Sequence, residues 1–147
     1  MLEGALILVP LLALLLALID FSFVIFLRTT FQHAAREGVR YAITYQTMPS
    51  LSHDASIKSV VQTNAMGFLN GAPGAALIFI RYYRPDTMAE LTGVNSNGPG
   101  NLVEISVEGY SWNWIAPIWR TSTPLLMTAR ASDRMEGLPG GQLPPAR

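Results

Sequence analysis

Two side chains, those of His33 and His53, carry protons near neutral pH, so a proton-transfer site would have to include one of them. Ser52, His53 and Asp54 are the residue types of a hydrolase triad, but neighbours in sequence at a helix start do not face one another. Ser52 instead fits a helix cap, and Asp54 fits the first turn. No G-x-S-x-G, H-E-x-x-H, G-x-x-x-x-G-K-[ST] or G-x-G-x-x-G string occurs. We therefore expect a helix start here, no catalytic residues and no enzymatic activity.

Glu104 and Glu108 lie four residues apart on a predicted strand, which places both on one face as candidate metal ligands. No nearby residue supplies the remaining ligands, and a solvent-facing strand edge is the better interpretation. The sequence has no cysteine, which excludes disulfide scaffolds and thiolate zinc sites. Ten Lys+Arg balance ten Asp+Glu without a basic tract, which argues against nucleic-acid binding. We expect no metal site and no cofactor.

Three tryptophans, Trp112, Trp114 and Trp119, lie in a turn-rich stretch between two predicted strands. Large aromatic side chains in a loop typically cover a small core or anchor an interface. We expect at least one of them to cover the core of the head. The others would pack on a neighbouring subunit or lie at the level of lipid headgroups.

A long apolar segment precedes these residues in a chain of 147 residues that is 50% hydrophobic and only 14% charged. Soluble domains usually carry about 25% charge. The 24 residues from Gly4 to Leu27 contain one ionisable side chain, Asp20. Because a hydrocarbon core of ~30 Å needs about 20 helical residues, the segment is predicted to span a membrane. A cleavable signal fits less well, since its apolar part is typically about 7 to 15 residues.

Three residues of this segment are unusual in an apolar helix. Pro10 removes a backbone donor and is expected to kink or loosen the helix, and we expect it to lie between subunits. Asp20 costs ~2.5 to 3.5 kcal/mol near a bilayer centre and less near its edge. It either meets a cationic or hydrogen-bonding partner on a neighbouring subunit or reaches interfacial water. Glu3, on the first turn, is placed to neutralise the free amino group of a neighbouring subunit.

The helix is predicted to continue past the membrane, from about residue 2 to residue 46. Beyond Leu27 the apolar residues follow a stripe at spacings of three and four, and the first breaker is Pro49. Ala34, Gly38 and Ala42 form a ladder of small residues on this stripe that would allow close contact between subunits. Packing against the sheet of the head is the alternative, and we favour it.

The rest of the chain is predicted to form an α+β head with one helix and a three-stranded antiparallel sheet. The helix follows Ser52, and the strands cover residues 75–83, 102–110 and 125–132. We divide the chain into the N-terminal helix (1–46), the head (47–136) and a Pro/Gly-rich tail (137–147). The tail is expected to be extended or disordered unless a partner holds it.

The flanking charges bear on topology. Arg28, Arg36 and Arg40 follow the span, whereas only Glu3 precedes it, so the positive-inside rule places the head in the cytoplasm. The alternative is that a short basic leader has been removed by a prepilin-type peptidase.

Two stretches give the chain a family resemblance. Glu3-Gly-Ala-Leu-Ile-Leu-Val-Pro10 runs into the leucine-rich span, and Gln32-His-Ala-Ala-Arg-Glu-Gly-Val-Arg-Tyr-Ala42 follows it. Together with the two C-terminal strands they resemble TadE-like pseudopilins of tight-adherence (Flp-type) pilus systems. The resemblance implies a type IV pilin-like fold and an inner-membrane precursor with its head outside the cytoplasm. Prepilin peptidase would trim it, and Tad-type secretion machinery would extract it into a filament with a core of bundled N-terminal helices.

We therefore expect a structural subunit that polymerises with copies of itself, through its N-terminal helix, into an extracellular filament on the bacterial surface. A minor, priming pseudopilin is one alternative. Another is a monomeric, singly anchored membrane protein whose head binds a ligand or partner. An anchored hydrolase lacks any supporting motif.

Overall fold

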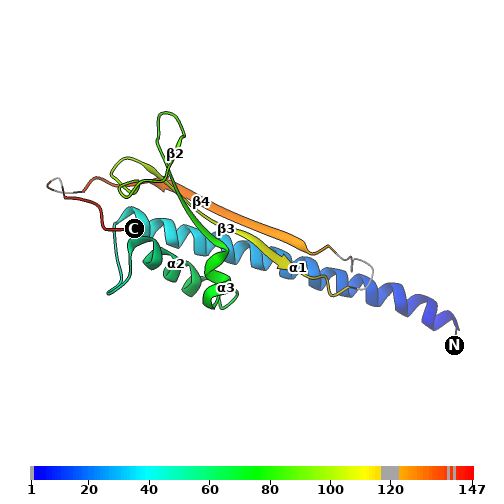
Figure 1. Ribbon diagram of the computed structural model, residues 1–147. Coiled ribbons are helices and arrows are strands. Elements are labelled where there is room, and N and C mark those ends of the chain that lie inside the picture. Colours follow the sequence, from blue (N-terminus) through cyan, green and yellow to red (C-terminus); the bar gives the residue numbers. More distant parts are fainter. Residues whose placement is uncertain (1, 117–122, 139, 141) are drawn as a thin grey trace.

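The computed structural model describes residues 2–116, 123–138, 140 and 142–147. One long helix, α1 (Leu2–Ile43), runs along the molecule, and the head is built along its second half, so that the N-terminal part projects (Figure 1). The long predicted helix is confirmed, but it ends at Ile43 instead of near residue 46. Tyr45 adopts a φ of 55°, a left-handed conformation that an α-helix cannot continue.

In its described residues, the head contains two further helices and a sheet of four antiparallel strands in the order β2-β1-β3-β4. The α+β class is confirmed. The predicted number of three strands is wrong, because the sheet also contains the short edge strand β2. The first long strand also begins at Ile78 instead of Ala75, because the preceding residues form a short helix. The bounds are α2 (His53–Asn64), α3 (Gly71–Ala76), β1 (Ile78–Tyr83), β2 (Glu90–Leu91), β3 (Leu102–Trp112) and β4 (Leu125–Arg134).

The core of the head forms where α1 packs against α2 and against strands β3 and β4. Ser52 caps α2 as predicted, since its side chain accepts a hydrogen bond from the N–H of Ala55. The largest fully buried apolar side chains come from α1, α2, β1, β3 and the connection after α2: Leu27, Phe31, Ile57, Val61, Leu69, Ile78, Tyr82, Val103, Ile105 and Val107. The second half of α1 is thus the central element of this small core.

A β-bulge in β3 changes which side chains face α1. Before it, Val103, Ile105 and Val107 are buried against the core. The register with β4 shifts between Glu108 and Tyr110, and Gly109 adopts a φ of 77°. Because one extra residue reverses the alternation, even-numbered residues point inward from Tyr110 onward. The regular alternation predicted for this strand therefore ends at the bulge.

The outer face of the sheet carries an ion-pair cluster. Arg81 on β1 lies 2.7 Å from Glu108 and 3.6 Å from Glu104, and Arg130 on β4 lies 4.0 Å from each glutamate. The hydrogen bond from Arg81, and after it the hydrogen bond from Ser106, lowers the pKa of Glu108 to about 2. The two glutamates face outward from the sheet. Because β3 lies between β1 and β4, the prediction that they belong to an edge strand is wrong.

The described part of the C-terminal tail folds back onto the head. The backbone N–H of His53 donates to the carbonyl of Ala146 at 2.8 Å, and Asn97 donates to the carbonyl of Pro145 at 2.9 Å. Arg147 lies 2.9 Å from the carboxylate of Asp54. The tail was expected to need an outside partner, and these contacts within the chain hold it instead.

Candidate functional site

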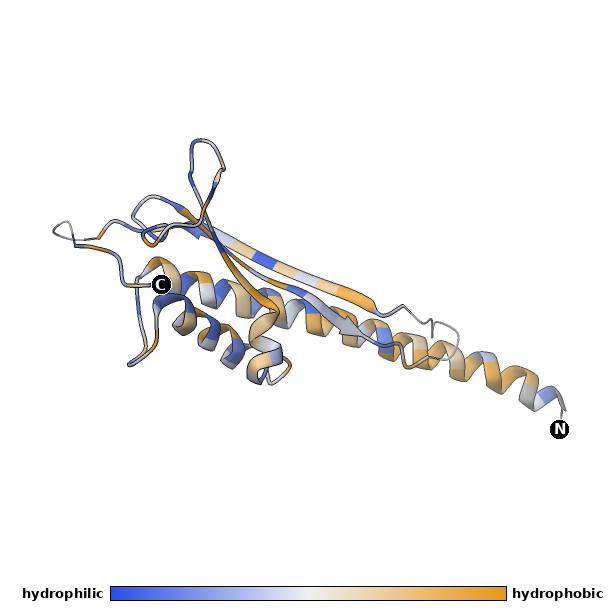
Figure 2. Cartoon of the chain, in the orientation of Figure 1, coloured by the Kyte–Doolittle hydropathy of each residue, from blue (hydrophilic) through white to orange (hydrophobic). Residues whose placement is uncertain are grey.

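The N-terminal part of α1, Leu2–Ile19, projects beyond the head, and we call it the exposed span. Most of its large apolar side chains are exposed, from Leu6 at 72% to Ile19 at 48%, whereas Leu16 is half-buried. Figure 2 shows the apolar residues that dominate this part of the helix. α1 is long and apolar enough to cross a membrane. Glu3 and Pro10 are exposed here, and their predicted place between subunits stays a prediction.

The second part of α1, Asp20–Ile43, packs one face against the head while Phe21, Ile25 and Phe26 stay exposed, and we call it the held segment. Ala34 and Ala42 are fully buried in it, and Gly38 lies between them on the same face. A Cβ atom added at Gly38 would lie 2.6 Å from a methyl group of Val61 and 3.2 Å from Ile105. In the single chain, the small-residue ladder therefore admits α2 and β3, which is the alternative favoured from the sequence.

Aromatic side chains of β3 and its continuation line up along the held segment, and we call Tyr110, Trp112 and Trp114 the aromatic row. Their ring centroids pair in turn with three phenylalanines of α1: Phe31 at 4.8 Å, Phe23 at 5.3 Å in a stacked arrangement, and Phe21 at 6.4 Å. Trp112 and Trp114 thus cover α1 within their own chain. Trp119 lies outside the described residues.

The signal for this row was present in the sequence, because its aromatic residues alternate with Ser111 and Asn113 directly after Gly109. A glycine followed by a new alternation is typical of a bulged strand. We predicted that the tryptophans lie in a loop, and we therefore did not predict that Tyr110 belongs to the same surface.

The carboxylate of Asp20 is fully buried at the junction between the exposed span and the held segment. It accepts hydrogen bonds from the backbone N–H of Ile115 at 3.0 Å and of Ala116 at 2.7 Å. We call this arrangement the Asp20 clamp. The hydrogen-bonding partner that was predicted on a neighbouring subunit is thus present in the same chain. Backbone N–H groups have no residue signature, so the sequence alone could not identify them.

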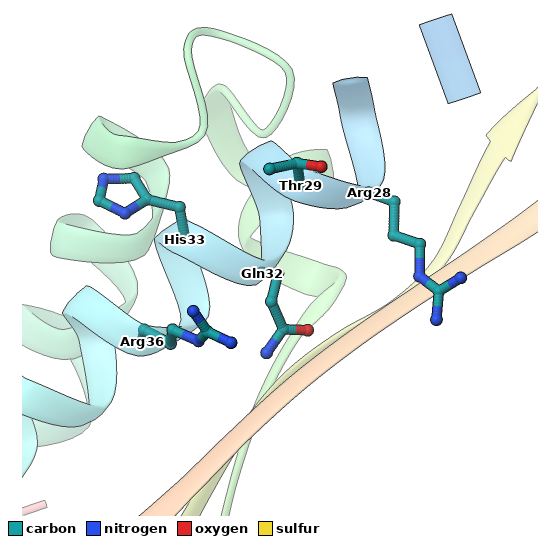
Figure 3. Close-up of a pocket in the computed structure, with 5 residues that line it drawn as sticks. All are labelled: Arg28, Thr29, Gln32, His33 and Arg36. Carbon is teal, nitrogen blue, oxygen red and sulfur yellow. The ribbon is translucent and has the colours of Figure 1, made fainter. Parts of the chain in front are cut away.

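An open groove of about 600 Å³ follows the clamp along α1. It is lined by Arg28, Thr29, Gln32, His33 and Arg36, which Figure 3 shows as successive side chains of one helix. Gln32 donates a hydrogen bond to the backbone carbonyl of Arg130 at 2.8 Å, and so joins α1 to β4. The groove is cationic and shallow, and His33 lies exposed on it.

The residues of the candidate triad make separate contacts. Ser52 caps α2, while His53 is buried with its Nδ1 atom 3.3 Å from the amide nitrogen of Asn97. Burial lowers the pKa of His53 and so favours the neutral ring. Asp54 accepts a hydrogen bond from the Tyr82 hydroxyl at 2.9 Å, and burial and this carboxylate raise the pKa of Tyr82. These contacts tie α2, β1 and the tail together as structural links.

Metal binding finds no support in the described part of the chain. No group of three or more His, Cys, Asp or Glu side chains capable of holding a metal ion occurs among the described residues. Glu104 and Glu108, the candidate ligands in the sequence, are neutralised by Arg81 and Arg130.

Comparison with known proteins adds one match. A family model described as TadE-like protein matches residues 1–40, which cover the exposed span and most of the held segment. The resemblance noted in the sequence is thereby confirmed over this part of α1. No curated protein and no solved structure matches the chain.

Proposed function

We propose that this chain is a non-enzymatic, pilin-like structural subunit that polymerises through α1 into a Tad-type pilus. The match of residues 1–40 to the TadE-like family implies a pseudopilin associated with such a pilus. The single observation that carries the proposal is the exposed span, where the large apolar side chains between Leu6 and Ile19, except Leu16, are 48–72% exposed. A surface of this kind needs lipid or other helices around it.

The same surface serves both stages of the proposed assembly. In the precursor, lipid of the inner membrane surrounds the exposed span, and in the filament the spans of other copies replace the lipid. The precursor would be trimmed by prepilin peptidase, extracted by the Tad-type machinery and carried to the cell exterior. The heads, which have their own core around the held segment, would then form the outside of the filament.

Glu3 gives the first test. Its carboxylate is proposed to neutralise the amino group of a neighbouring subunit in the apolar filament core, where an unpaired charge is costly. Glu3→Leu should abolish filaments in material sheared from cells, measured by electron microscopy and by mass spectrometry of the subunit. Glu136→Leu, which removes an exposed carboxylate of the head, should leave the filament yield unchanged. Normal yield from Glu3→Leu would contradict the proposed role of Glu3.

Cysteine cross-linking tests polymerisation directly, because the chain has no cysteine of its own. Leu11→Cys lies on the exposed span and should form disulfide-linked dimers under mild oxidation in sheared filaments. Ala34→Cys lies in the core of the head, and we expect no cross-link from it. Protein that stays monomeric at Leu11→Cys, with no fibres outside the cell, would favour a singly anchored protein instead. Cross-linking at Ala34→Cys would show that the small-residue ladder lies between subunits.

A further inference from the structure

We propose that the Asp20 clamp and the aromatic side chains beside it form a collar that lies in the headgroup region of a bilayer and fixes the depth of the head. The collar consists of Phe21, Phe23, Trp112, Trp114 and Ile115. It would place Asp20 at the edge of the hydrocarbon core. This inference rests on the membrane-inserted stage of the proposed function, and it concerns the head instead of the polymer.

The length of the exposed span is the first argument. Leu2–Ile19 is about 27 Å long at about 1.5 Å per residue, and a hydrocarbon core is about 30 Å thick. The head begins to cover one face of α1 directly afterwards, at Asp20, which is 0% exposed, whereas Phe21 and Ile25 are still 59% and 62% exposed. A bilayer that covers the exposed span therefore reaches Ile115 and Ala116, which bind Asp20.

The chemistry of the collar is the second argument. Phe21 is 59% exposed and Ile115 is 49% exposed, although both adjoin the fully buried Asp20. Trp114 is half-buried against Phe21, with the ring centroids 6.4 Å apart. Tryptophan is enriched where a membrane meets water, because its ring is apolar and its N–H is polar. The collar thus continues the apolar surface of the exposed span and adds the amphipathic ring of Trp114 to it, whereas the Nε1 atom of Trp112 is buried.

The Asp20 clamp explains how a carboxylate is tolerated at this depth. A charged side chain in hydrocarbon is costly, and it requires partners that replace water. The N–H groups of Ile115 and Ala116 are such partners, at 3.0 and 2.7 Å. The same bonds hold the β3–β4 connection against α1 and leave the Ile115 side chain facing outward. Asp20 is therefore a positioning residue for the collar.

Arg28 marks the water side of the collar. It lies about 12 Å beyond Asp20 along the helix, at about 1.5 Å per residue. Its guanidinium projects from α1 at the edge of the cationic groove (Figure 3). A long basic side chain at this position reaches lipid phosphates while its methylene groups remain near the apolar surface. Apolar span, aromatic rings and arginine thus follow one another in the order of the layers of a bilayer.

Depth-dependent fluorescence quenching tests the collar. The full chain is placed in phosphatidylcholine and phosphatidylglycerol vesicles whose acyl chains are brominated either near the headgroup or near the chain end. A variant with Trp112→Phe and Trp119→Phe leaves Trp114 as the reporter. We expect shallow bromine to quench Trp114 at least about twofold more strongly than deep bromine. Two reporters in a background without the native tryptophans calibrate depth: Leu11→Trp in the exposed span and Thr87→Trp in the β1–β2 connection.

Each outcome of this experiment has a defined meaning. Deep quenching of Leu11→Trp, shallow quenching of Trp114 and no quenching of Thr87→Trp support the collar. If Leu11→Trp is quenched but Trp114 is not, protein covers the collar, and this inference fails while the proposed function stands. If Leu11→Trp is not quenched either, both fail, because α1 does not enter the bilayer.

A second variant tests the role of Asp20. Asp20→Ala leaves the N–H groups of Ile115 and Ala116 without their acceptor, so the β3–β4 connection should detach from α1. The difference between shallow and deep quenching of Trp114 should then fall by at least about half. Asp133→Ala removes an exposed carboxylate from β4 and should leave the difference unchanged. Retained depth preference in Asp20→Ala would overturn the positioning role.

Discussion

Between Leu6 and Ile19 most side chains of α1 are exposed and none is fully buried, whereas between Leu27 and Ala42 one face is buried completely. Both regions belong to one uninterrupted helix. The difference lies in what supports them, because the held segment packs against α2 and the sheet. The exposed span is a helix that satisfies its backbone through its own hydrogen bonds, which suffice in lipid. One helix therefore combines a folded core with a surface kept open for other molecules.

Two glycines make the same contrast at the scale of one atom. A Cβ atom at Gly4 would meet nothing within 4 Å, whereas at Gly38 it would lie 2.6 Å from Val61. Glycine at position 38 therefore permits the close approach of α2, and glycine at position 4 has no such function in the single chain. The same substitution should therefore destabilise the fold at position 38 and leave it unchanged at position 4.

Removal of a large side chain is the strongest test of this contrast. Phe31 is fully buried beside Tyr110 and Phe68, so Phe31→Ala should reduce the free energy of unfolding by about 3–5 kcal/mol. Leu11 is 52% exposed, and Leu11→Ala should change it by less than about 0.5 kcal/mol. Urea unfolding of the purified chain in detergent micelles, followed by tryptophan fluorescence, measures both. Equal losses would show that the exposed span belongs to the folding unit of the head.

Addition of volume should reproduce the contrast with a smaller effect. Gly38→Val inserts methyl groups between α1 and α2 and should cost about 2 kcal/mol, as overpacking does elsewhere. Gly4→Val should cost nothing in the same unfolding assay. Because Val61 provides the closest atom, Val61→Ala combined with Gly38→Val should restore part of the loss, and a double-mutant cycle measures this coupling. Purely additive effects would contradict the proposed close approach.

Much of this division was predictable from hydrophobic patterns. An apolar run on all sides indicated the exposed span, and spacings of three and four indicated the buried stripe that contains Phe31 and Ala42. The α2 cap and the three long strands followed from cap chemistry and alternation. Each of these features arises from local sequence, which is why a single chain contains enough information for them.

The features that escaped prediction depend on contacts between distant residues. Strand β2 has two residues and exists through its pairing with Tyr82 and Tyr83. The acceptor role of Asp20 depends on backbone groups 95 and 96 positions away. The tail is held by Arg147, whose partner Asp54 lies 93 positions away. None of these pairings leaves a periodic pattern in the sequence.

The outer face of the sheet provides the smallest and most specific test, because it lies away from α1. The hydrogen bonds from Arg81 and Ser106 lower the pKa of Glu108 from 4.5 to about 2. A lowered carboxyl pKa stabilises the fold above the ordinary value, and this contribution is lost as the pH falls from about 4.5 towards 2. Glu108 is partly exposed, so we expect a contribution below about 1 kcal/mol. Urea midpoints measured across this pH range should fall less in Glu108→Gln and in Arg81→Gln than in the unmodified chain. An acid-induced loss as large as that from Phe31→Ala would mean that the sheet's outer face, and not its packing on the held segment, controls the stability of the head.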